Sequence, residues 1–154
     1  MEALKNINTE KILFLDIETA PQYPAYKDIP ETFQKLWDLK AKRLLTEKET
    51  PADVYKQAGI YAEFGKIICI SVGFLTWTDG AQTFRMKSFA GEDEKVLLTD
   101  FANLLRKHYA RPEHRLCGHN IKEFDIPFMA RRMIINGVPL PNMLDIAGKK
   151  PWEI

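Results

Sequence analysis

Residues 11–20 read Lys11-Ile-Leu-Phe-Leu-Asp-Ile-Glu-Thr-Ala20. The apolar run Ile12 to Leu15 has the length and the β-branched and aromatic composition of a strand buried on both faces. The run nevertheless leads into two acids, Asp16 and Glu18. Because side chains alternate along a strand, both carboxylates are expected on one face, about 6–7 Å apart. Carboxylates so close repel each other unless a proton or a cation lies between them, so this stretch predicts a divalent metal site.

The composition is that of one globular domain with a hydrophobic core. Of 154 residues, 45% are hydrophobic and 28% are charged, which is the balance of a single folded unit. Lys and Arg number 22 against 21 for Asp and Glu, so net charge neither favours nor excludes a polyanionic partner. From residue 101 onward there are nine basic residues and five acids, which is compatible with a phosphate-facing side or with an ordinary solvated face.

The cysteines and the chain start indicate the compartment. Cys69 and Cys117 lie within apolar segments, where a thiol is expected to be a small buried hydrophobe and no disulfide framework is expected. The stretch Met1 to Glu10 lacks the apolar core of a signal peptide, and no run approaches the roughly 20 apolar residues of a membrane span. The predicted location is the cytoplasm, without a membrane partner.

A helical insertion is predicted over about residues 28–62. Prolines at positions 21, 24 and 30 interrupt regular structure after the acidic strand. The sequence Asp28-Ile-Pro-Glu31 predicts a helix start with Asp28 as N-cap, and apolar residues keep helical spacing from Phe33 to Leu45. The sequence Thr50-Pro-Ala-Asp53 repeats this signal and predicts a second, shorter helix that reaches Ala58.

The remaining pattern predicts an α/β fold with a mixed sheet. Residues 66–77 and 82–89 read as paired strands around the turn Asp79-Gly80. Residues 96–109 read as an amphipathic helix ended by Pro112, residues 115–118 as a short strand, and residues 126–136 as a helix that stops at Gly137. In this order the short strand is expected to lie parallel beside the first strand. Ligand-binding groups gather at the ends of such central strands.

A second polar group follows the short strand, in Gly118-His-Asn-Ile-Lys-Glu-Phe-Asp-Ile-Pro127. Asp125 is expected to cap the following helix by accepting backbone N–H bonds, and the same junction would hold its carboxylate opposite Asp16. Asn120 is expected to bond loop backbone or to contact a substrate phosphate or orient a ligand carboxylate. A packed or hydrogen-bonding role is expected for His119.

The two segments together resemble a known family. Phe14-Leu-Asp16-Ile-Glu18-Thr19 is similar to the first motif of the DEDD 3′–5′ exonucleases. Asn120-Ile-Lys-Glu-Phe124-Asp125 is similar to their second motif, Asn-x-x-x-Phe-Asp, as found in the proofreading domains of family B DNA polymerases. The layout between the motifs resembles the ribonuclease H-like fold. The resemblance covers most of the chain, apart from the helical insertion.

The resemblance implies metal-dependent hydrolysis of terminal phosphodiesters of single-stranded DNA. Asp16, Glu18 and Asp125 would be catalytic, metal-binding acids for two divalent cations, Mg²⁺ or Mn²⁺, roughly 4 Å apart. Thr19 would hold the 3′-terminal nucleotide, and Asn120 and Phe124 are candidate substrate contacts, with core packing as the other role for Phe124. RNA is a possible alternative substrate, and such a function suggests DNA repair or proofreading.

The third motif of that family, Tyr-x-x-x-Asp or His-x-x-x-Asp on a last helix, is not found after Asp125. Asp145 is preceded four residues earlier by Pro141, and Pro139, Pro141 and Gly148 argue against a helix there. The family fold would also require a further strand and helices at the C-terminal side. The expectation is therefore one ribonuclease H-like domain over residues 1–154, truncated at its C-terminus.

Two other functions fit parts of the pattern. A non-catalytic ribonuclease H-like module would only hold nucleic-acid ends. A phosphatase of the haloacid dehalogenase type also has an acid, a spacer, a second acid and a Thr after an apolar strand. Glu18 stands where that family usually has Asp, and the second segment would then have no role.

Overall fold

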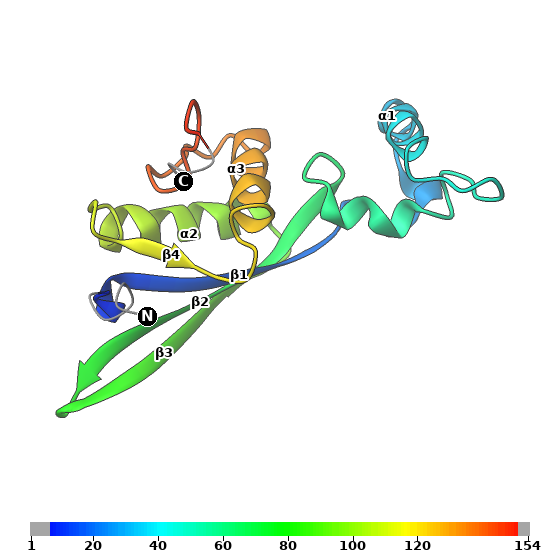
Figure 1. The fold of residues 1–154 in the computed structure, drawn as a ribbon. Helices are drawn as coiled ribbons and strands as arrows, with labels where there is room; N and C mark the ends of the chain where they lie inside the picture. Colours follow the sequence, from blue (N-terminus) through cyan, green and yellow to red (C-terminus); the bar gives the residue numbers. More distant parts are fainter. Residues whose placement is uncertain (1–6, 151–154) are drawn as a thin grey trace. The chain divides into compact units, whose positions relative to one another are not determined.

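The fold is α/β, with a four-stranded mixed sheet in the order β3-β2-β1-β4 (Figure 1). The computed structural model describes residues 7–150. The strands are β1 (Ile12–Pro21), β2 (Gly65–Thr78), β3 (Ala81–Ala90) and β4 (Arg115–Cys117). The chain divides into two compact units: one holds the part up to Glu18 and the part from Ile68 onward, and the other is Thr19–Ile67.

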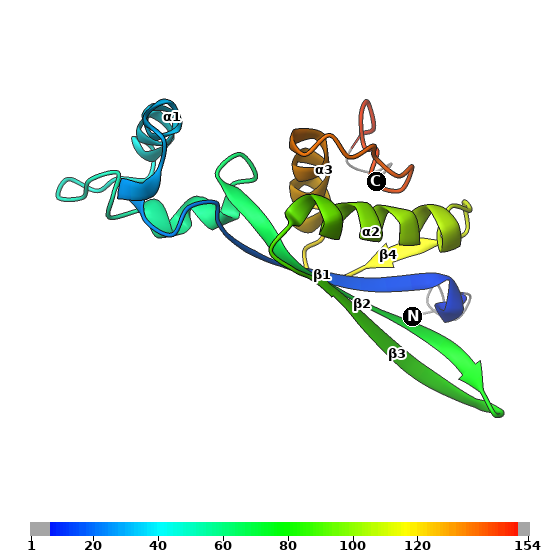
Figure 2. The ribbon, with the colours of Figure 1, turned by 180° about the vertical axis from the view of Figure 1, so that it is seen from behind.

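In the first unit, two helices lie on one face of the sheet, as Figures 1 and 2 both show. They are α2 (Glu94–His108) and α3 (Asp125–Ile135). Asp93 caps α2 by accepting the N–H of Val96 at 3.1 Å. At the end of α3, Gly137 has a φ of +66° and the N–H of Val138 donates to the carbonyl of Met133 at 2.8 Å. This is a Schellman ending, which favours glycine, and the predicted helix stop at Gly137 is confirmed.

The burial of β1 shows which face is covered. Leu13, Leu15 and Ile17 are buried, whereas Asp16 and Glu18 are exposed. The predicted alternation of the two acids onto one face is therefore confirmed. The expectation of a strand buried on both faces is wrong, because α2 and α3 cover only one of them within the described residues. The covering side chains are large apolar ones: Leu98, Phe101, Leu105, Met129 and Met133 are fully buried.

The hairpin and the parallel pair follow the sequence closely. Strands β2 and β3 pair antiparallel with Thr78 opposite Ala81. The two turn residues between them, Asp79 and Gly80, have φ of +53° and +78°, as a type I′ turn requires. Strand β4 pairs parallel with β1, from Ile12 opposite Arg115 to Phe14 opposite Cys117. Both predictions are confirmed.

A buried ion pair joins the two helices. The Arg132 Nε and Nη2 atoms of α3 lie 2.9 and 2.5 Å from the two carboxylate oxygens of Glu94 at the start of α2. The Asn136 amide donates to the same carboxylate at 3.0 Å. Arg132 is 4% exposed and Glu94 9%. Because little solvent reaches the two charges, the hydrogen bonds between them must compensate for the cost of burying them. The pair fixes the start of α2 against α3.

The second unit, Thr19–Ile67, contains α1 (Glu31–Ala41) and two 3₁₀ helices, Tyr26–Asp28 and Tyr55–Ile60. Its core is built around Trp37, whose ring packs edge-on against Tyr55 and Phe64 and whose Nε1 donates to the Pro51 carbonyl at 2.9 Å. The backbone N–H of Gln22 donates to the Phe64 carbonyl at 2.9 Å. This bond therefore holds the two ends of the segment between Gln22 and Phe64 next to each other.

Three predictions in this unit need correction. Asp28 is not an N-cap: it ends a 3₁₀ helix, and Pro30 immediately precedes α1. The helix stops at Ala41 rather than Leu45, and turns follow. At Thr50 the predicted bonds form, since its N–H and hydroxyl reach the Asp53 carboxylate at 2.8 and 2.7 Å. They close a turn, because such local side-chain bonds also stabilise non-helical turns. The short helix predicted after it is present as the 3₁₀ helix Tyr55–Ile60, which begins two residues after Asp53.

Cys117 is exposed and Cys69 is half-buried, so the expectation of two buried thiols is wrong; Cys117 lies on the short, partly covered edge strand. Residues 138–150 form turns without a helix, as the prolines there predict. No helix within residues 7–150 is long and apolar enough to cross a membrane.

Candidate functional site

The candidate site begins with Asp16 and Glu18 on the uncovered face of β1. Both side chains are exposed, and the buried Ile17 between them points into the helix-covered layer. The alternation of the strand produces this arrangement directly. Among residues 7–150, no side-chain hydrogen bond or ion pair involves either carboxylate. Both carboxylates therefore present their oxygen atoms to the solvent on this face of the sheet.

Asp125 reaches the same part of β1 from the start of α3. Its Oδ1 accepts the backbone N–H of Ile17 at 3.2 Å, although the two residues are far apart in the sequence. Asp125 is 3% exposed. The prediction that it caps α3 is corrected, because Phe124 occupies the N-cap position without a side-chain bond and Asp125 is the first helical residue. Its carboxylate bonds β1 instead, next to Asp16.

The electrostatics of Asp125 reflect this position. Burial raises the pKa of its carboxyl above the ordinary value, because it penalises the charged form. Hydrogen bonds from its own N–H and from that of Ile17 lower the pKa, the negative charge of Asp16 raises it, and His119 lowers it. Asp16 and His119 are therefore both close enough to act on Asp125. A carboxyl with a raised pKa beside a second acid is typical of functional sites, although structural networks also produce it.

Gly118 explains why the loop before α3 can approach β1. A Cβ atom at this position would lie 2.4 Å from the carbonyl oxygen of Leu15 and 2.3 Å from the Ile121 side chain. Only a residue without a side chain fits so close to a backbone oxygen. The glycine thus lets the loop pass beside the strand that carries Asp16, and this brings the two sequence segments together.

The remaining predicted site residues differ in exposure and in the contacts that they make. Asn120 is exposed, with a φ of +53°, and its carbonyl accepts the N–H groups of Glu123 and Phe124 at 3.1 Å, so it forms a turn. Phe124 is half-buried with its ring 5.4 Å from that of Phe128, which is packing. His119 is exposed, so the packed role is wrong, whereas the alternative hydrogen-bonding role stays a prediction. Thr19 is half-buried and belongs to the second unit.

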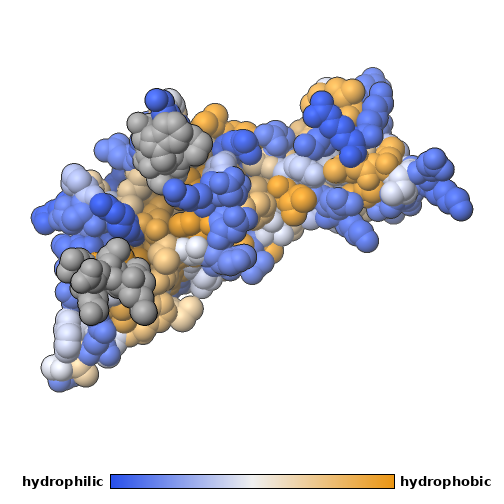
Figure 3. Space-filling model, viewed as in Figure 1, coloured by the Kyte–Doolittle hydropathy of each residue, from blue (hydrophilic) through white to orange (hydrophobic). Residues whose placement is uncertain are grey.

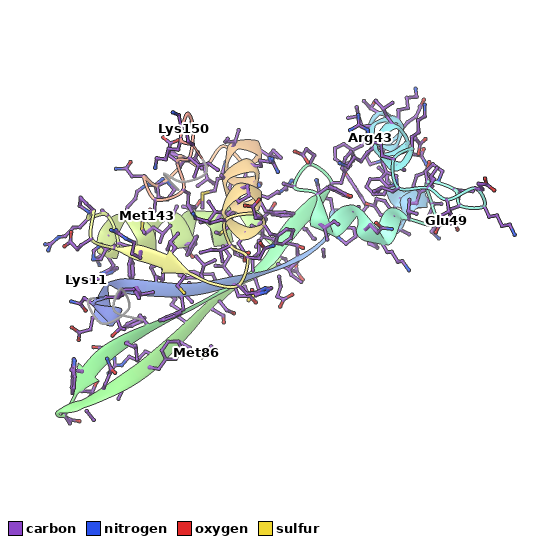
Figure 4. All side chains as sticks on the ribbon, in the orientation of Figure 1. Lys11, Arg43, Glu49, Met86, Met143 and Lys150 are labelled. Atoms are coloured by element: carbon purple, nitrogen blue, oxygen red, sulfur yellow. The ribbon has the colours of Figure 1, made fainter. Side chains whose placement is uncertain are left out.

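An aromatic contact next to Asp16 was not predicted. Phe14 lies two residues before Asp16 on the same face of β1, and its ring meets that of Phe84 of β3 edge-on at 5.7 Å. The two rings meet across β2 because Gly73 of that strand has no side chain: a Cβ there would lie 2.2 Å from the Phe84 ring. Met86, labelled in Figure 4, is opposite Gly73 and 73% exposed. A glycine inside a strand often marks such a close approach, and this was the available signal.

The donor chemistry suits a hard divalent cation, but the three acids do not form a ready cage. Among residues 7–150 no group of three His, Cys, Asp or Glu side chains is close enough to hold a metal ion. Asp125 is committed to the Ile17 amide, whereas Asp16 and Glu18 are exposed carboxylates. Mg²⁺ is commonly held by one or two carboxylates, with water and substrate phosphates completing its shell. Asp16 and Glu18 fit that mode.

Comparisons with protein-family models, with curated proteins and with solved structures find no match for this chain.

Proposed function

We propose that the chain is a ribonuclease H-like, metal-dependent 3′–5′ exonuclease that hydrolyses terminal phosphodiesters of single-stranded DNA. The observation that carries this proposal is the hydrogen bond from Ile17 to Asp125, 3.2 Å long. It links the acid of the Asn-x-x-x-Phe-Asp segment to the backbone between Asp16 and Glu18. The mixed sheet, with β4 parallel to β1, is compatible with the ribonuclease H-like arrangement.

In the proposal, Asp16 and Glu18 hold Mg²⁺ or Mn²⁺, and a bound cation would lower the pKa of a water molecule and offset the charge of the scissile phosphate. The Asp125 carboxyl group, either ionised or protonated, lies beside Asp16. Its hydrogen bond from the Ile17 N–H fixes its position. Asn120 is proposed to contact the terminal nucleotide. The exposure of Asp16 and Glu18 supports their access to a substrate phosphate.

The test is hydrolysis of oligonucleotides labelled at either end by the full chain with Mg²⁺ or Mn²⁺. A 5′-labelled single strand should yield a ladder of products shortened from the 3′ end. Asp16→Asn should reduce the rate by at least about 100-fold, as expected when an electrostatic stabiliser of the transition state is removed. Glu92→Gln, an exposed acid before α2, is the matched control. Unchanged hydrolysis by Asp16→Asn refutes the assignment.

A second candidate is a non-catalytic module that binds nucleic-acid ends. It is favoured by one observation: neither the third motif nor a three-ligand acid cluster occurs in the part of the chain that the structure describes. The module would bind a single strand equally well with EDTA and with Mg²⁺. The exonuclease should bind more tightly with Mg²⁺, and this gain should disappear in Asp16→Asn. Titration of a labelled oligonucleotide under both conditions separates the two functions.

A further inference from the structure

A basic cavity lies beside β4, on the first unit. It has a volume of about 710 Å³ and is lined by β4, by the loop before α3 and by the segment around residues 142–149. Among residues 7–150, every ionisable side chain in its lining is basic: Arg111, His114, Arg115, Lys122 and Lys149. Four acids adjoin lining residues in the sequence without lining the cavity themselves: Glu113, Glu123, Asp125 and Asp145. The Glu113 carboxylate lies 3.9 Å from Lys11 and from Arg111.

The cations are held at the rim and not drawn into the core. Arg111 and Lys149 are exposed. The Arg115 guanidinium donates to the Pro112 and His114 carbonyls, which fixes its position. Carbonyl groups carry no net charge, so these two bonds do not neutralise it. Among residues 7–150, the lining contributes four Lys and Arg side chains and no acid. Such an excess of positive groups around one cavity attracts an anion with several charges.

Part of the cavity lining is apolar, and we call this part its floor. Leu116, Ile121, Met143 and Ile146 contribute to the lining, and Met143 is labelled in Figure 4. Figure 3 shows hydrophobic surface between hydrophilic side chains in the region where β4 and the C-terminal segment lie. A phosphate ion alone would gain nothing from such a floor. A single strand of nucleic acid presents charged phosphates and unpaired apolar base faces together, whereas a duplex hides its bases.

We propose that this cavity binds the sugar-phosphate backbone of a single-stranded nucleic acid, with its bases against the apolar floor. The inference rests on the proposed function, because it assigns the cavity to the part of the strand upstream of the end that is hydrolysed. Continuity of the chain supports it: the loop that lines the cavity with Ile121 and Lys122 ends at Asp125, beside Asp16. The cavity would thus hold the strand independently of the metal-binding acids.

The experiment measures binding without hydrolysis, by fluorescence anisotropy of a 5′-labelled oligothymidylate with the full chain in EDTA. The double variant Arg111→Gln/Lys149→Gln should weaken binding by up to about fivefold per cation removed. The slope of log affinity against log salt should fall by about 0.7 for each lost phosphate contact. The matched control is Lys95→Gln/Lys107→Gln, which removes two exposed charges from α2.

The outcomes separate the two proposals. Weaker binding and a smaller salt slope in the cavity variant, with the control unchanged, support the cavity even if the chain hydrolyses nothing. Equal losses in both variants, or none in either, overturn it, whatever the nuclease assay gives. Competition by polyglutamate as strong as by unlabelled oligothymidylate also overturns it, since the floor would then contribute nothing. Parallel titrations with oligouridylate and with a duplex of equal length test the choice of a single strand; a duplex bound as tightly overturns that choice.

Discussion

The carboxylate of Asp125 accepts the backbone N–H of Ile17, so an acid from the start of α3 is bonded to the strand position that separates Asp16 from Glu18. Because Asp125 is buried and Asp16 is not, the acids of the candidate site differ in environment. One is shielded and has a raised pKa, whereas its neighbour is open to solvent. Such a difference can be measured through pH dependence.

We predict that the wild-type protein loses stability as pH rises through the pKa of Asp125, and that Asp125→Asn abolishes this loss. The pKa of Asp125 is raised in the folded state, so the protonated form stabilises the fold at low pH. This contribution is lost as pH rises through the folded pKa, which lies above the ordinary value of 3.8. The difference in unfolding free energy, variant minus wild type, should therefore increase as pH rises from below 4. Urea unfolding from pH 3.5 to 7 in EDTA, with Asp100→Asn as control, measures it; a flat difference contradicts the prediction.

Breaking the Glu94–Arg132 pair should be costly. Glu94→Gln keeps the shape of the side chain but leaves the Arg132 charge buried without its carboxylate, so we expect a loss of about 3–5 kcal/mol in unfolding free energy. Glu31→Gln removes an exposed partner of Lys35, 2.7 Å away, and should change stability little. Chemical unfolding of both variants checks the contrast. If the two substitutions lower the unfolding free energy equally, the buried pair is no more important for stability than the exposed one, and the prediction is wrong.

Gly118→Ala should disturb the site more than its small volume suggests. The added methyl group would meet the Leu15 carbonyl oxygen at 2.4 Å, and a backbone oxygen cannot move away as a flexible side chain can. We expect a loss of about 1–3 kcal/mol and a shift of the loop that carries Asn120. Gly91→Ala is the matched control, because a Cβ there meets nothing within 4 Å. Unfolding curves give the energy, and backbone amide chemical shifts near Ile17 report the displacement; equal stability of both variants argues against the close approach.

The Phe14–Phe84 contact should be detectable as a coupling energy. A double-mutant cycle with Phe14→Leu and Phe84→Leu is expected to give about 0.5–1.5 kcal/mol beyond the separate effects, typical of an edge-to-face aromatic pair. Gly73→Ala should abolish that coupling, because its methyl group would occupy the position of the Phe84 ring. Urea unfolding of the four members of the cycle, repeated in the Gly73→Ala background, provides the test. Additive effects of the two leucine variants would rule out the contact in solution.

Elements with strong local signals were predictable from the sequence. Asp79-Gly80 determines the hairpin turn through two positive φ angles, and Gly137 ends α3 for a similar reason. Local signals failed where the same side-chain hydrogen bonds occur both in turns and at helix starts. Thr50 and Asp53 form the expected hydrogen bonds but close a turn, and Asp28 ends a 3₁₀ helix instead of capping α1.

The candidate site shows a different limit. Alternation along the strand was sufficient to place Asp16 and Glu18 on one face, since this depends only on neighbours in the chain. The partner of Asp125 was not predictable from the helix-start pattern, because the Ile17 amide that it bonds lies in a distant segment. The burial of His119 and Cys117 was misjudged for the same reason: exposure depends on which face of the sheet the helices cover.

The backbone bond between Gln22 and Phe64, supplemented by the Gln22 side chain donating to the Glu63 carbonyl at 2.9 Å, closes the segment between them at its base. Closing a loop costs entropy that grows only slowly with its length. Residues 23–63 can therefore lengthen, shorten or be exchanged for a short connecting turn at little cost to the strands that flank them. This part of the chain is a natural position for grafting a foreign domain.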